Sequence, residues 1–287
     1  RETIEHPWSI PDDIRGKLDL ENGRDRGRIY RLAPPGFTVP KPPRLGAASN
    51  PELVATLENP NSWWRETAQR LLFERRDSAA VPPLRDLLSR STSELARLHA
   101  LWTLDGLDAL RDEDIARGLA DRSAGVREHA VRLAAPRIAK ADELRRAVFA
   151  LAGDDEIRVR YHVAFAAGGV ADDSAVDVAL AILRRDAADR WVRSAALSAP
   201  PDQCVRFAEK LLADPARPGG EGGREVVRQL AFVTGAQNKP ANLDAVFAAF
   251  DLGPRPSPVA IPPSDQGRSR SQVEEAFWTG LGDGLRQ

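Results

Sequence analysis

The sequence predicts an all-α protein, a solenoid of about six helix pairs that is preceded by a short β/loop remnant. The first observation behind this prediction is a motif that returns about every 30 to 35 residues. The second is an apolar stripe of helical period on the copies of the motif, with further stripes between successive copies. The third is a change of composition at both ends of the chain, where Pro and Gly interrupt the helical pattern.

The repeated motif consists of a small or apolar residue, Arg, two variable residues and then Ala. Val163 replaces Ala in the fourth copy, and the sixth copy is the weakest. Such regular self-similarity is typical of units that stack and bury one continuous core. The motif arginines are Arg65, Arg97, Arg127, Arg160, Arg193 and Arg228.

Each unit is predicted to contain two antiparallel helices, and the second helix carries the motif. Residues four and seven apart share a helical face, which places Val126, Ala130 and Leu133 on one stripe. The helices between the motif copies are marked by the stripes Val81, Leu84 and Leu88, then Leu144, Val148 and Leu151, then Val205, Ala208 and Leu212. The shared place of four motif alanines predicts their burial where paired helices meet, namely Ala68, Ala100, Ala130 and Ala196.

The motif also narrows the class of repeat. The T-P-L-H-x-A signature of ankyrin repeats and the W-x-x-L-G-x-x-Y signature of tetratricopeptide repeats are absent. An acidic residue or Asn, followed by Val-Arg-x-x-Ala and Leu, resembles the second helix of a HEAT repeat. The period is shorter than the ~40 to 47 residues usual for that class, and is similar to the short repeats of the bilin-lyase type. The predicted fold is therefore a HEAT-like solenoid.

Composition divides the chain into four predicted parts. Residues 1–48 form a β/loop segment with one strand over residues 27–32, where polar and apolar residues alternate. Residues 49–252 hold the repeats, residues 253–270 form a Pro-rich linker or loop, and residues 271–287 form a terminal helix that could be truncated. The sequence contains no Met, and a single strand needs partners, so we expect the chain to be a fragment of a longer protein.

Charge and cysteine content exclude several classes of function. Lys and Arg number 41 against 42 Asp and Glu, giving a net charge of −1, whereas dedicated nucleic-acid binders have a basic excess. No apolar run reaches the length of a membrane span. The single cysteine, Cys204, excludes an intrachain disulfide and a multi-cysteine zinc site, and we expect it to be packing within a helix. The fingerprints of serine hydrolases, P-loop proteins, zinc proteases and dinucleotide-binding folds are absent.

Three histidines occupy one place in the motif, two residues after the arginine. They are His99, His129 and His162. Equivalent residues of a solenoid form a column, so these imidazoles are candidate ligands of a metal or a haem. No motif fixes a carboxylate beside them, and a His ligand needs companions and supporting hydrogen bonds. We expect half-buried histidines that hydrogen-bond to a neighbouring repeat, and no metal or cofactor site in this chain.

The motif arginines have two interpretations. Asn59, Asp121 and Asp154 lie six residues before three of them, where they could cap the second helix and accept hydrogen bonds from the Arg of an adjacent repeat. We expect this structural ladder. The alternative is a basic stripe for phosphates, as in the helical-repeat alkylpurine DNA glycosylases that such arrays resemble.

Two further features carry weaker signals. Trp63 and Trp64 are consecutive and cannot share a helical face, so one should pack inward while the other borders a possible interface. Gly219 to Gly223 precede a helix, but no strand precedes them and no Lys-Ser/Thr follows, so we expect a flexible loop and not a phosphate site.

The N-terminal segment resembles one bacterial family. Residues 5–11, Glu-His-Pro-Trp-Ser-Ile-Pro, and residues 25–37, Asp-Arg-Gly-Arg-Ile-Tyr-Arg-Leu-Ala-Pro-Pro-Gly-Phe, look like the end of a β-propeller in planctomycete-type membrane-bound dehydrogenase or haem-binding proteins. In that family HEAT repeats follow the propeller, and a c-type cytochrome domain often comes last; residues 97–107 resemble its repeat region. The resemblance implies an exported redox protein of the cell envelope or periplasm, with haem or quinone only in domains that this chain lacks.

These observations lead to three hypotheses about function. The first is a non-catalytic connector scaffold from an exported propeller dehydrogenase-like protein, with a propeller domain, a cytochrome domain or another protein as partner. The second is a free-standing HEAT-repeat scaffold that binds a protein. The third and most distant is a DNA glycosylase or lyase-type enzyme. Of these we expect a chain that is not by itself an enzyme and does not bind nucleic acid.

Overall fold

A computed structural model describes residues 7–19, 32–39, 41, 43–198, 203–237, 239–249 and 272–285. The chain divides into two compact units, residues 1–44 and residues 45–287. In the first unit a 3-10 turn, Pro7–Ser9, precedes the short helix α1, Asp12–Arg15. Residues 27–31 of the predicted strand and all of the Pro-rich segment 253–270 lie outside the described residues, so both remain predictions.

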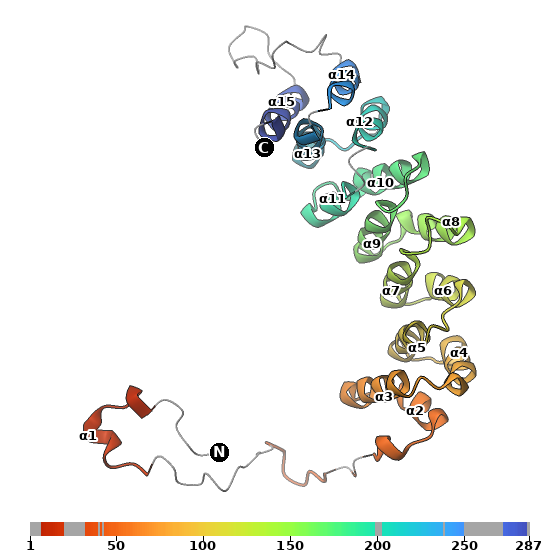
Figure 1. The fold of residues 1–287 in the computed structure, drawn as a ribbon, viewed down its shortest axis with the longest axis vertical. Coiled ribbons are helices and arrows are strands. Elements are labelled where there is room, and N and C mark those ends of the chain that lie inside the picture. Colours follow the sequence, from red (N-terminus) through yellow and green to blue (C-terminus); the bar gives the residue numbers. More distant parts are fainter. Residues whose placement is uncertain are drawn as a thin grey trace. The chain divides into compact units, whose positions relative to one another are not determined.

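The second unit is an all-α helical-repeat solenoid, as the repeat predicts (Figure 1). Its described residues form six helix pairs and two further helices. The pairs are α2 (Asn50–Thr56) with α3 (Ser62–Arg75), α4 (Val81–Arg90) with α5 (Glu94–Gly106), α6 (Asp112–Leu119) with α7 (Ala124–Ala134), α8 (Asp142–Ala150) with α9 (Ile157–Ala167), α10 (Asp173–Asp186) with α11 (Arg190–Ala196), and α12 (Cys204–Ala213) with α13 (Gly220–Gln237). The helices α14 (Pro240–Ala249) and α15 (Gln272–Leu285) follow, and α15 packs along α13.

The helices of this unit form two layers. Helices α3, α5, α7, α9 and α11 contact one another in sequence and form what we call the odd layer. Helices α2, α4, α6, α8, α10 and α12 form the even layer on the other side (Figure 1). The motif helices are those of the odd layer, together with α13. Among the residues of both units that the structure describes, no helix is long and apolar enough to cross a bilayer.

Small residues at the motif positions allow the layers to approach closely. The four motif alanines predicted to be buried are 0 to 1% exposed, which confirms the register of the repeat. A Cβ added to Gly118 of α6 would lie only 2.9 Å from the Cβ of Ala130 on α7. Larger side chains at either place would therefore separate the paired helices.

Two predictions about the C-terminal repeats are wrong in detail. The buried face of α12 is made by Cys204, Phe207, Ala208 and Leu211, whereas Val205 and Leu212 of the predicted stripe are only half-buried. The large apolar ring of Phe207 sets the inward face of the helix. The prediction of a flexible loop over residues 219–223 is also wrong, because α13 begins at Gly220. A Cβ at Gly222 would lie 2.5 Å from the carbonyl oxygen of Ala187, so close packing of the helix requires glycine there.

Candidate binding face of the odd layer

The motif arginines of the odd layer fasten the turn that precedes their own helix. In each of these five repeats the Nη1 group donates to the backbone carbonyl six residues earlier. The bonds are Arg65 to Asn59 (2.7 Å), Arg97 to Ser91 (2.9 Å), Arg127 to Asp121 (2.9 Å), Arg160 to Asp154 (2.5 Å) and Arg193 to Ala187 (2.6 Å). A charged donor satisfies a turn carbonyl that no helix bond uses.

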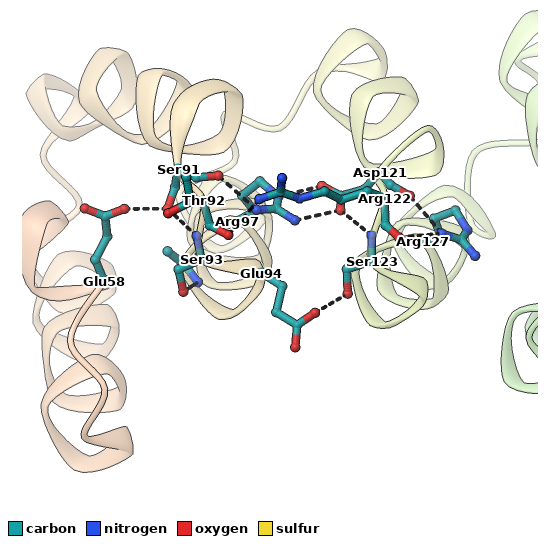
Figure 2. Close-up of polar contacts among 11 residues, drawn as sticks. Glu58, Ser91, Thr92, Ser93, Glu94, Arg97, Asp121, Arg122, Ser123 and Arg127 are labelled. Carbon is teal, nitrogen blue, oxygen red and sulfur yellow. Dashed lines mark hydrogen bonds and ion pairs between the residues drawn. The ribbon is translucent and has the colours of Figure 1, made fainter.

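Three of these arginines also reach a carboxylate of the next repeat. Arg97 binds Asp121 with two hydrogen bonds, of 2.6 Å from Nε and 2.8 Å from Nη2 (Figure 2). The pairs Arg127 with Asp154 and Arg160 with Asp186 repeat this geometry. The side chains of the first pair are 6% and 8% exposed and those of the last pair 4% and 8%. Each guanidinium therefore joins two successive repeats inside the packed structure.

The arginines lower the pKa of the aspartates that they bind. Burial alone would raise the pKa of Asp121, but hydrogen bonds from Arg97 and from the backbone N–H of Ser123 outweigh it and lower that pKa. The hydrogen bond from Arg127 likewise lowers the pKa of Asp154, against the effect of burial. Both aspartates are held as carboxylates.

The predicted capping role needs a correction. Asn59, Asp121 and Asp154 accept a hydrogen bond from the N–H two residues later, at 2.9, 2.8 and 2.9 Å. That residue is the N-cap itself, so these side chains close a turn just before the helix and do not cap its first turn. Sequence reasoning missed Asp186, because it lies seven residues before the next motif arginine and not six.

The carboxylate pairs end where the sequence lacks an acidic residue. Asp121 and Asp154 lie six residues before a motif arginine and bind the arginine of the preceding repeat; the corresponding residue facing Arg65 is Ser91. The Nε of Arg65 instead lies 3.4 Å from Nε2 of His99. The corresponding residue facing Arg193 is Gly222, and the Nε of Arg193 is buried without a hydrogen-bond partner among the described residues. Arg228 turns to Glu225 on its own helix. The arginine column is thus engaged with protein groups over most of its length and does not form a free basic stripe.

The three histidines are half-buried on the odd layer and each contacts the preceding repeat. His99 pairs with Gln69 (2.7 Å), His129 accepts from the indole N–H of Trp102 (2.9 Å), and Nε2 of His162 lies 3.3 Å from Glu128. Burial lowers the pKa of all three imidazoles; the carboxylate of Glu128 opposes this only in part at His162.

No candidate metal centre is present in the described part of the chain, where no group of three or more His, Cys, Asp and Glu side chains is placed to hold an ion. The histidine column does not bring its imidazoles to a shared point. Cys204 is buried at the start of α12, and Gln237 donates to its Sγ at 3.3 Å.

Exposed apolar side chains are concentrated on one layer. In the second unit, every large hydrophobic side chain that the structure describes as exposed belongs to the odd layer. These residues are Trp63 and Phe73 on α3, Leu95 on α5, Ile157 and Phe165 on α9, and Trp191 on α11. Trp63 and Trp191 are 62% and 61% exposed, while Trp64 is half-buried. Sequence reasoning proposed only Trp63 and Trp64 as interface residues. Of the others, Leu95 and Trp191 lie two residues before the motif arginine, as Trp63 does, and Phe165 lies five residues after it. Phe73 and Ile157 lie at positions where no other repeat has a large exposed apolar side chain among the described residues.

Exposed arginines lie among these apolar groups. The guanidinium of Arg132 lies over the ring of Trp102 at 5.6 Å, and that of Arg190 lies over Trp191 at 4.7 Å. The odd layer therefore presents aromatic and cationic groups together, as protein interfaces commonly do. We call this surface the odd-layer face.

Comparisons with known proteins do not identify a family for this chain. No protein-family model and no curated protein matches the chain, so neither connects it with the propeller dehydrogenases. Solved structures of similar form include two engineered proteins from a structural genomics consortium and a designed armadillo repeat protein in complex with a (KR)4 peptide. The two engineered proteins share 20 and 15% identity with this chain, cover 82 and 84% of it, and are matched over 95 and 100% of their own chains. The armadillo repeat protein shares 16% identity, covers 83% of this chain and is matched over 100% of its own. Their TM-scores are 0.31, 0.32 and 0.32, so the fold assignment rests on the helices described above.

Proposed function

We propose that this chain is a non-catalytic scaffold that binds a segment of another protein on the odd-layer face. The observation that supports the proposal is the gathering of exposed Trp, Phe, Leu and Ile side chains on that layer. Large apolar side chains gathered on one exposed surface, with polar residues between them, mark interaction surfaces in soluble proteins. Trp and Arg are also the residue types that carry much of the energy of protein interfaces.

The arginine column supports the scaffold and not a nucleic-acid enzyme. A phosphate-binding stripe needs guanidinium groups that are free to reach the ligand. In this chain the guanidinium groups of Arg97, Arg127 and Arg160 are bonded to aspartates of the next repeat. Their role in this proposal is to hold the repeats in register, so that the odd-layer face presents a fixed surface.

The finer proposal places the scaffold as a connector within an exported propeller dehydrogenase-like protein of the cell envelope. It rests on the resemblance of residues 5–11 and 25–37, of which residues 5, 6 and 25–31 lie outside the described residues. The gene sequence on either side of this chain tests it. A propeller upstream and a CxxCH motif downstream support the connector, and their absence leaves a free-standing scaffold.

Selection from a library of random peptides tests the binding proposal on the full chain. Trp63→Ser combined with Trp191→Ser removes two exposed aromatic groups of the odd-layer face. The matched control is Arg117→Ser with Arg146→Ser, which changes two exposed side chains of the even layer. Enriched peptides are expected to lose at least about tenfold in affinity on the tryptophan variant and to bind the control as they bind the parent chain. Failure to enrich any peptide, or equal loss on both variants, contradicts the proposal.

A further inference from the structure

A cavity opens on the odd layer between the first turns of α5 and α7. It measures about 350 Å³. Its apolar walls come from Leu95 and Leu98 of α5 and from Ala124 and Val126 of α7. An engineered cavity of about 150 Å³ admits benzene, so this space has room for one aromatic side chain.

Gly125 lines the cavity and places no side chain in it. Gly125 lies two residues before the motif arginine, where the other odd-layer repeats carry Trp63, Leu95, Arg158 and Trp191. Its backbone φ is not positive, and a Cβ at this place would meet only Ser123 Oγ, at 3.7 Å, within 4 Å among the described residues. Glycine is a poor helix former, and here neither backbone conformation nor packing requires it. What it does provide is the opening.

A cation stands at the α9 side of the cavity. The guanidinium-bearing side chain of Arg158 is 66% exposed, and its contacts with Glu128 and Glu156 are long, at 3.7 and 3.8 Å. The carboxylate at the α5 side, Glu94, is instead occupied by a hydrogen bond of 2.6 Å from Ser123 (Figure 2). An exposed guanidinium beside an apolar cavity favours the negative face of an aromatic ring. The same chain already pairs Arg190 with Trp191 in this way.

We propose that the Gly125 cavity is the specificity pocket of the odd-layer face. It accepts one aromatic side chain of a partner protein, with the ring against Leu95 and Leu98 and the guanidinium of Arg158 over its face. This inference rests on the proposed function. It specifies the kind of partner side chain that is recognised and the place on the odd-layer face where it binds.

Two small probes test the pocket directly on the full chain. N-acetyl-L-phenylalanine amide offers an aromatic ring, and N-acetyl-L-cyclohexylalanine amide offers a saturated ring of similar shape. Amide chemical shifts of Leu95, Leu98 and Val126 report binding during a titration with each probe. The phenylalanine probe is expected to shift these amides saturably and more strongly at equal concentration than the cyclohexyl probe.

Three variants separate the contributions. Gly125→Leu fills the cavity with the side chain that Leu95 carries at the same motif place, and is expected to abolish the saturable shifts. Gly125→Ala is its matched control, because it adds helix propensity while leaving the cavity open, and it retains binding. Arg158→Gln is expected to weaken the phenylalanine probe roughly two- to fivefold, as an exposed cation–π contact does, and to leave the cyclohexyl probe unchanged. Circular dichroism establishes that each variant is folded.

Each alternative outcome overturns the inference in a distinct way. Shifts that persist in Gly125→Leu place the probe elsewhere, and equal weakening of both probes by Arg158→Gln removes the aromatic preference. Concentration-dependent shifts of the same amides without probe, lost in Gly125→Leu, make a second copy of the chain the occupant. If library peptides still require Trp63 and Trp191 while the probe results are negative, this inference fails and the binding scaffold stands.

Discussion

Replacing Asp121 by Asn probes the links between repeats. The exchange keeps the size of the side chain and one oxygen, which continues to accept the N–H of Ser123, but it removes the charge opposite Arg97. Both side chains of this pair are less than 10% exposed. Leaving one partner of a buried ion pair uncompensated costs about 3 to 5 kcal/mol. Because Asn retains a hydrogen-bond acceptor, we expect the free energy of unfolding to fall by about 3 kcal/mol, the lower end of that range.

Asp108→Asn is the matched control for this substitution. Asp108 pairs with Arg76 at 2.6 Å, a distance equal to that of the Arg97–Asp121 pair, but the two side chains are 81% and 58% exposed. An exposed pair contributes about 0 to 1 kcal/mol. The two variants therefore apply the same chemical change at the same shortest distance, to a buried pair with two hydrogen bonds and to an exposed pair with one.

Urea unfolding followed by circular dichroism measures both variants, and hydrogen exchange of the α5 and α7 amides shows whether the loss is local. The cost of Asp121→Asn should persist in about 1 M salt, where the Debye length is about 3 Å and exposed pairs are screened. It should shrink in acid. The lowered pKa of Asp121 means that its contribution is complete above its ordinary value of 3.8 and is lost as the pH falls through the lowered one. Equal effects of the two substitutions at neutral pH would refute the reasoning.

Three further predictions follow from the same contacts. Ala130→Arg should lower the free energy of unfolding by at least about 1 to 3 kcal/mol, because Ala130 is fully buried where α6 meets α7; an unchanged thermal melt would contradict the register of the repeat. Burial lowers the pKa of His99, His129 and His162 below the ordinary 6.5, so stability should fall as the pH drops from about 7 to about 5.5, and replacing all three by Gln should reduce that dependence in urea titrations. Haem titration should leave the Soret band of free haem unchanged, since each imidazole contacts its own partner in the preceding repeat; a saturating shift near one haem per chain, lost in His129→Ala, would overturn this.

The repeat and its register could be predicted from the sequence because one structural unit recurs. Five of the six motif copies combine a buried arginine or a half-buried one with a small residue three positions later, and recurrence separates this pattern from chance. The same argument failed for α12, where no motif fixes the phase and Phe207 competes with Val205 and Leu212 for the inward face. The sequence also did not predict that Gly222 lies in a helix. The reason for a glycine there is the close approach of the Ala187 backbone, which only the structure shows.

The surface was harder to predict than the core. Burial leaves a periodic signal, whereas the exposed positions of a solenoid vary from repeat to repeat. The arginines could be taken for a phosphate site or a ladder until their partners were known, and Asp186 lies one residue out of phase with the other aspartates. The pocket at Gly125 is defined by a missing side chain, and it becomes visible only when Leu95 and Arg158 are placed beside it.

Photo-cross-linking tests the central claim, that the odd-layer face binds a protein segment, most directly. A benzophenone amino acid replaces Phe165, exposed on α9 of the odd layer, in one protein and Ala181, exposed on α10 of the even layer, in another. Each is irradiated with a library-selected peptide and analysed by mass spectrometry. The proposal predicts a covalent adduct from position 165 and none above background from position 181. Adducts from position 181 alone would place the peptide on the even layer and contradict the claim.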